Sequence, residues 1–92
     1  MLGGLSTPPS EELHVDYQPQ VDLLFAWVGE PQKARNIEVE PGVYVRVSET
    51  KRVVGIEILD CSVRFERTPD SIDRAFAESK LKEYGPLALA NA

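Results

Sequence analysis

Few residues in the chain of 92 could carry chemistry, and the first pair lies near its start. His14, the single histidine, is followed two positions later by Asp16. On a strand such residues share a face, so the two could bind a metal weakly. A stable site needs a third ligand, which a dimer axis would have to supply. We therefore favour a histidine at the surface or at a sheet edge.

Carboxylates offer a second chemistry. Glu57 lies in a strongly apolar segment, where it could act as a general acid or base together with Asp22 or Asp60. The alternative is a structural carboxylate at the rim of the sheet, bound to Arg46 or to a free backbone N–H. We favour the structural role and keep four residues as the alternative ligand-binding or hydrolytic set: His14, Asp22, Glu57 and Asp60.

Cys61 and Ser62 are the candidate nucleophiles, and they directly follow Asp60. Neighbours on a strand point to opposite faces, so these residues do not form a catalytic triad, and no G-x-S-x-G motif is present. A single cysteine excludes an intrachain disulfide and a four-cysteine zinc site. We expect no catalytic, cofactor-binding or metal-binding residues, and favour a non-enzymatic protein.

The charge balance argues against nucleic acid as a partner. Ten Lys and Arg residues oppose fifteen Asp and Glu residues, which gives a net charge of −5, and the basic residues are scattered. Binding to phosphate backbones needs a concentrated basic face. No run of eighteen apolar residues and no secretory signal pattern occurs, so we expect no membrane span and a cytoplasmic location.

Alternating apolar residues predict an α+β domain with a small antiparallel β-meander of about four strands and a C-terminal helix. Residues 13–17, 21–28, 36–40, 43–48 and 53–59 read as extended, with Pro41 and Gly42 in a type II turn. The 21–28 segment is apolar on both faces beyond Asp22. The predicted dry face is Val21, Leu23, Phe25, Trp27, Ile37, Val39, Val43, Val45, Val47, Val54, Ile56 and Ile58.

Glycine and proline mark the remaining boundaries. Gly55 inside a strand predicts a bulge or a close backbone approach. Residues 63–65 alternate and could extend or bend that strand. We expect a helix from an N-cap at Thr68 to about Tyr84, ended by Gly85 and Pro86. The domain organisation follows: a flexible arm at 1–12, one domain at 13–85 and a tail at 86–92.

Two segments resemble a known family. Tyr17-Gln-Pro-Gln-Val-Asp-Leu-Leu-Phe25 is similar to the opening Y-D-x-x-x-D-x-L-Y/F of the prokaryotic family catalogued as domain of unknown function 2283. The segment from Val53 to Ser62 resembles its motif V-G-I-E-I-L-D-A-S. Gln18 and Cys61 depart from the usual Asp and Ala, and the turn at 49–52 lacks the usual Gly.

The resemblance implies a compact β-meander with a C-terminal helix or extension and no established activity. Its members often lie beside genes for small ribonuclease-like toxins, which implies an antitoxin-like, partner-binding role. A single helix covers such a sheet incompletely, and leftover apolar area commonly finds a partner. We therefore expect a homodimeric protein-interaction module, with a small toxin-like protein as a further partner.

Overall fold

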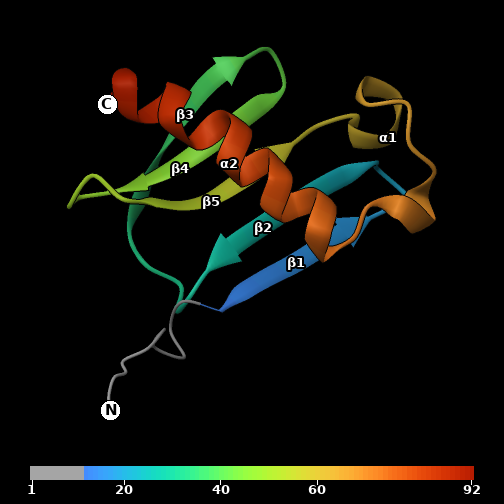
Figure 1. Cartoon of the computed structure of the whole chain (residues 1–92), viewed down its shortest axis with the longest axis horizontal. Helices are drawn as coiled ribbons and strands as arrows, with labels where there is room; N and C mark the ends of the chain where they lie inside the picture. Colours follow the sequence, from blue (N-terminus) through green and yellow to red (C-terminus); the bar gives the residue numbers. More distant parts are fainter. Residues whose placement is uncertain (1–11) are drawn as a thin grey trace.

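The computed structural model describes residues 12–92, so nearly all of the arm predicted at 1–12 lies outside the described residues. Five antiparallel strands form one sheet in the order β1-β2-β5-β4-β3, which places β5 in the middle. The helix α2 lies diagonally across one face of this sheet (Figure 1). The predicted α+β class with a C-terminal helix is confirmed, with five strands instead of about four. The strands are β1 (Leu13–Gln18), β2 (Leu23–Val28), β3 (Ala34–Glu40), β4 (Val43–Ser48) and β5 (Val53–Ile58).

The core lies between α2 (Arg74–Ala90) and the sheet face beneath it, which we call the helix face. Strands β2, β4 and β5 contribute alternate aliphatic side chains that are almost completely buried, because side chains two apart on a strand share a face. The helix adds Phe76, Ala77, Tyr84 and Ala88. The buried strand residues of the helix face are Leu24, Ala26, Val43, Val45, Val47, Ile56 and Ile58.

The predicted face of β2 is wrong. Leu24 and Ala26 are fully buried, whereas Phe25 and Trp27 lie on the opposite face and Val21 is 62% exposed. Leu23 shares the face of Phe25. The side chains on both faces of this segment are apolar, so their alternation does not show which face is buried. A shift of one residue moves every side chain to the opposite face of the sheet. Packing of Leu24 and Ala26 in the core beneath α2 decides the face, and Asp22, in a left-handed conformation (φ 55°), lies one residue before β2 begins.

The bulge expected at Gly55 is confirmed, and it corrects the placement of Val54. Arg46 pairs with Gly55 but Val47 pairs with Val53, so Val54 is the extra residue of β5. Val53 therefore faces α2, and Val54 lines a pocket on the other side of the sheet. A Cβ at Gly55 would lie 2.9 Å from the carbonyl oxygen of Ala26, which explains the glycine.

The predicted helix bounds are also wrong at both ends. Pro69–Ser71 form a 3-10 turn, and α2 begins at Arg74 with the Asp73 carboxylate accepting from the Phe76 N–H at 3.0 Å. The helix passes through Gly85 and Pro86 to Ala90. Gly85 lies against Val53 and Ala88 is fully buried, so packing of this last part outweighs the hydrogen bond that proline cannot donate.

Residues 63–65 do not continue β5. Asp60 takes a left-handed conformation (φ 52°), and the short helix α1 (Cys61–Arg64) follows immediately. This turn takes the chain beyond the end of the central strand β5, and after α1 the chain leads to the start of α2 (Figure 1). Within residues 12–92, no helix is long and apolar enough to cross a membrane.

Candidate functional site

The face of the sheet opposite α2, which we call the open face, is a regular grid of side chains. Strand register places five residues side by side in each of two rows. The first, the Trp27 row, runs from β1 to β3 as His14, Trp27, Gly55, Arg46 and Asn36. The second, the Glu57 row, runs in the same direction as Asp16, Phe25, Glu57, Tyr44 and Glu38.

Three rings stack along one half of the open face. The His14 and Trp27 rings have centroids 5.2 Å apart at an interplanar angle of 22°, and Phe25 and Trp27 have centroids 5.1 Å apart at 28°. All three side chains are half-buried. Histidine is thus placed against an aromatic ring, and the sheet carries a continuous planar apolar surface that no described element covers.

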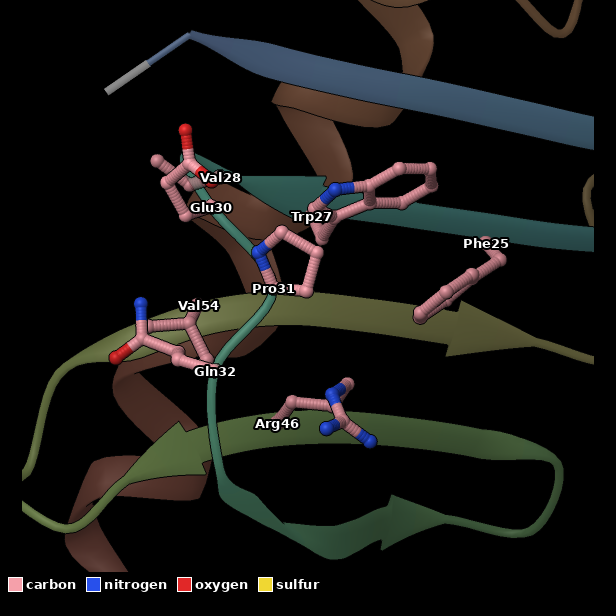
Figure 2. A pocket seen from close by; sticks show the side chains of 8 residues that line it. All are labelled: Phe25, Trp27, Val28, Glu30, Pro31, Gln32, Arg46 and Val54. Atoms are coloured by element: carbon pink, nitrogen blue, oxygen red, sulfur yellow. The ribbon is translucent and has the colours of Figure 1, made fainter. Parts of the chain in front are cut away.

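A pocket of about 190 Å³ adjoins this stack. Trp27 and Phe25 of β2, Val54 of β5 and Pro31 in the loop after β2 line it, and Figure 2 shows Pro31 beside Trp27. Arg46 and Glu30 bring opposite charges to the same pocket. Its size suits one amino-acid side chain or a small planar molecule, and its apolar walls favour such an occupant over an ion.

Of the two partners considered for Glu57, Arg46 and a free backbone N–H, Arg46 does not bind it. Arg46 and Glu57 lie on neighbouring strands but in different rows, and the Arg46 Nη1 donates to Asn36 Oδ1 at 3.1 Å. Among the described residues neither side chain takes part in an ion pair. The open face therefore holds a cation and several carboxylates that form no ion pair with one another or with any other residue of 12–92.

Asp22 has a different function, at the end of the sheet where α1 begins. Its carboxylate accepts from the Ser62 N–H at 2.9 Å, from the Ser62 hydroxyl at 2.8 Å and from the Tyr17 hydroxyl at 2.5 Å. Its carbonyl oxygen accepts from the Cys61 N–H at 3.0 Å. These contacts, which we call the Asp22 clasp, join the β1–β2 turn to the first turn of α1.

The electrostatics of the clasp match this structural role. Burial would raise the pKa of Asp22, but the hydrogen bonds from Tyr17 and Ser62 outweigh it and lower the pKa below 3.8. The hydrogen bond to Asp22 in turn raises the pKa of the Tyr17 phenol. A carboxylate that is ionised and already accepts these bonds has little capacity left for acid–base catalysis.

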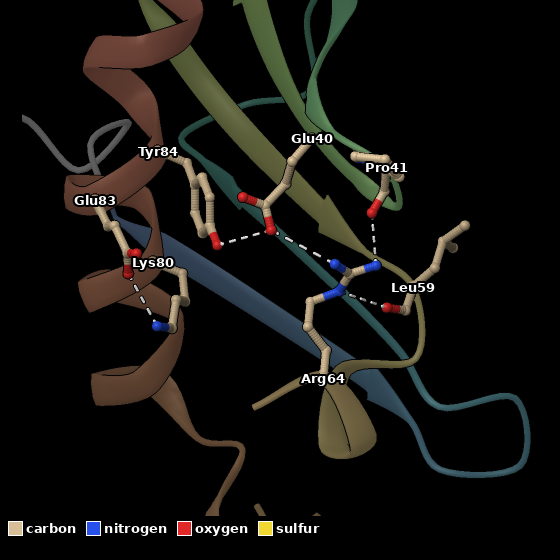
Figure 3. A network of polar contacts seen from close by, with 7 residues as sticks. All are labelled: Glu40, Pro41, Leu59, Arg64, Lys80, Glu83 and Tyr84. Atoms are coloured by element: carbon tan, nitrogen blue, oxygen red, sulfur yellow. Dashed lines mark hydrogen bonds and ion pairs between the residues drawn. The ribbon is translucent and has the colours of Figure 1, made fainter. Parts of the chain in front are cut away.

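Arg64 makes a second junction that the sequence pattern did not reveal (Figure 3). Its guanidinium donates to the carbonyl oxygens of Pro41 at 2.7 Å and Leu59 at 3.3 Å, and pairs with Glu40 at 3.5 Å. Glu40 also accepts from the Tyr84 hydroxyl at 3.3 Å. Burial and the nearby Glu40 raise the pKa of Tyr84 to about 12, so the phenol stays protonated and connects α2 to the β3–β4 turn.

The four residues kept as an alternative site do not come together. Asp22 belongs to the clasp, Asp60 is exposed in the turn before α1, and Glu57 and His14 lie in different rows with β2 between their strands. Cys61 is fully buried, and burial raises the pKa of its thiol to about 11. Within the described part of the chain, no three His, Cys, Asp or Glu side chains are grouped to hold a metal ion.

The geometry defines a small sheet-and-helix domain with one covered face, one open face and a carboxylate clasp at the sheet end. A family model described as protein of unknown function (DUF2283) matches residues 14–62. The match covers more than half of the chain, which therefore belongs to this family, and it extends from β1 to α1. No curated protein and no solved structure matches the chain.

Proposed function

We propose that this protein is a non-enzymatic protein-interaction module whose binding surface is the open face. The observation that carries the proposal is the ring stack of His14, Trp27 and Phe25, which lies beside charges without ion pairs among the described residues. No described helix or strand covers this face, and the loop at Pro31 borders it at one end. Interfaces are enriched in aromatic residues and arginine, and a half-buried planar surface of this kind loses little side-chain entropy on binding.

The carboxylates support a binding role over catalysis. Asp22 is engaged in the clasp, and the remaining members of the alternative set point to different parts of the surface. Catalysis needs a nucleophile or base, an orienting group and a stabiliser that converge on one reacting atom. The open face instead offers a broad grid, which suits contact with another protein surface.

Site-specific photocrosslinking tests the proposal. We would place p-benzoylphenylalanine at Tyr44, near the middle of the open face, and at the exposed Leu87 on α2 as the matched control. We expect discrete protein adducts from the Tyr44 position on illumination in cells, and none of the same mass from Leu87. Absence of any protein adduct from Tyr44 would refute a protein-binding open face.

The pocket beside Trp27 favours a second candidate function, binding of a small planar ligand between Trp27 and Pro31. Trp27 is the only tryptophan of the chain, so its fluorescence reports on this pocket directly. A metabolite fraction below about 1 kDa from the host should quench that emission if this function is correct. The homodimer, the cytoplasmic location and the small toxin-like partner stay predictions.

A further inference from the structure

The open face is complementary to itself. The Trp27 row carries His14 and Arg46, and the Glu57 row carries Asp16 and Glu57. The two rows are adjacent and parallel. Two copies can meet face to face about a two-fold axis that runs between the rows and parallel to them. Rotation about this axis places the Trp27 row of each copy over the Glu57 row of the other copy. A two-fold dimer requires this kind of match, because both copies present the same patch.

We propose that the partner of the open face is a second copy of this chain, docked face to face about this axis. The inference rests on the proposed function and names its partner. Each strand then lies over the same strand of the second copy. His14 lies over Asp16, Trp27 over Phe25 and Arg46 over Tyr44, which gives an imidazole–carboxylate pair, an aromatic pair and a cation–π pair, each formed twice.

In this arrangement, Gly55 on the central strand β5 lies opposite a charged side chain of the second copy. Glu57 of one copy lies over Gly55 of the other, a buried position that the Arg46 and Trp27 side chains of the same row cover. Arg46 of the second copy is the strand neighbour of that glycine and has no ion pair within its own described chain. Glu57 can therefore reach Arg46 across the interface, and the two charges left unmatched in one copy match in the dimer.

The alternative two-fold axis, along the strands, does not give this match. Because β5 is the central strand, that axis would place Glu57 of one copy on Glu57 of the other. Like charges that meet across an interface are destabilising. Trp27 would also lie over Arg46, and Phe25 over Tyr44. Each row would then face the same row of the second copy, so the basic residues of the Trp27 row would not meet the acidic residues of the Glu57 row.

The area of the open face is sufficient for a weak dimer. Five strands about 4.8 Å apart, with two rows and their margins along each strand, give roughly 600 Å² of accessible surface per copy. The total of about 1,200 Å² lies at the lower limit for specific interfaces, where weak and transient complexes are found. Two twisted sheets that pack in this way form a sandwich with a spacing of about 10 Å.

A charge-swap experiment tests the mode of docking. Sedimentation velocity of the full chain between about 1 and 500 µM should show conversion of a 10.2 kDa monomer to a dimer. Glu57→Lys alone and Arg46→Glu alone each create like-charge contacts and should weaken dimerisation by about tenfold or more. An equimolar mixture of the two variants restores both intersubunit pairs, so dimer should form again at close to the wild-type concentration.

Matched controls carry the same charge changes on the exposed side of α2. Glu78→Lys and Arg74→Glu should leave the dimer unchanged, and the thermal melts of all four variants show whether they fold. Acrylamide quenching of Trp27 gives an independent readout, since dimerisation should protect the indole in the wild type but not in the single open-face variants.

Distinct outcomes separate this inference from the proposed function. A wild-type monomer at all concentrations overturns the dimer, and so does a dimer that neither open-face variant weakens. If the Tyr44 crosslinks then join a different protein, the open face remains a binding surface and only the second copy is wrong. If Tyr44 gives no protein adduct, the proposed function fails as well.

Discussion

The Asp22 carboxylate holds both the backbone N–H and the hydroxyl of Ser62, a residue 40 positions later in the chain, at 2.9 and 2.8 Å. The two residues come from the two segments on which the resemblance to the family rests, and the bonds between them fix where β2 begins and where α1 starts. Asp22 and Ser62, candidate catalytic residues from the sequence alone, therefore stabilise the fold.

Asp22→Asn should therefore destabilise the protein. The amide keeps the shape of the side chain but loses the charge that strengthens three hydrogen bonds. We expect a loss of about 1–2 kcal/mol in the free energy of unfolding, since the site is partly open to water. Urea unfolding measures it. Glu78→Gln, which neutralises an exposed carboxylate on α2, is the control, and an equal effect of both changes would contradict the clasp.

Stability should also depend on pH through Asp22. Its pKa is lower in the folded state than its ordinary value of 3.8, so its contribution is present above pH 3.8 and is lost as the pH falls through the folded pKa. Thermal melts between pH 2 and pH 6 should show this loss in the wild type and a smaller one in Asp22→Asn. If the two acid profiles run parallel, Asp22 does not contribute in this way.

The assignment of the β2 faces gives a contrast between neighbours. Leu24 is fully buried against α2, so Leu24→Ala should lower the free energy of unfolding by about 2–5 kcal/mol. Phe25 lies on the open face, and Phe25→Ala should cost only about 1–2 kcal/mol in the monomer, from lost stacking and partial burial. Urea unfolding at low protein concentration compares them, and the reverse order would show that the faces are exchanged.

Gly55→Ala should be costly because the added Cβ would lie 2.9 Å from the Ala26 carbonyl oxygen and 3.2 Å from Arg46 Cδ. The strands would have to separate locally, at a cost of about 1–3 kcal/mol. Gly85→Ala is the comparison: its Cβ would lie 3.3 Å from Val53 Cγ2, and alanine favours a helix over glycine by about 1 kcal/mol. Differential scanning calorimetry should find the Gly55 variant clearly less stable, and equal melting temperatures would contradict the close approach at β5.

The features of this protein that depend on local physics could be predicted from the amino-acid sequence alone. Alternation in 43–48 and 53–58 specified the strands and most of their buried residues, because the apolar side chains of 43–48, and nearly all of those in 53–58, share one phase. Val54 is the exception, since the bulge in β5 turns it to the open face. The Pro41–Gly42 turn was determined because proline sets φ and Gly42 accepts a φ of 87°. Gly55 marked the bulge for a similar reason, since a side chain there has no room.

Only the tertiary structure decided which face of β2 is buried, where α2 ends and what Asp22 does. The β2 segment is apolar in both phases, so contacts with α2 and α1 made the choice. Gly85 and Pro86 are local stop signals that packing against Val53 and burial of Ala88 overrode. The clasp between Asp22 and Ser62 and the bonds of Arg64 to the β3–β4 turn join residues far apart in the chain, and such contacts exist only once the strands are in register.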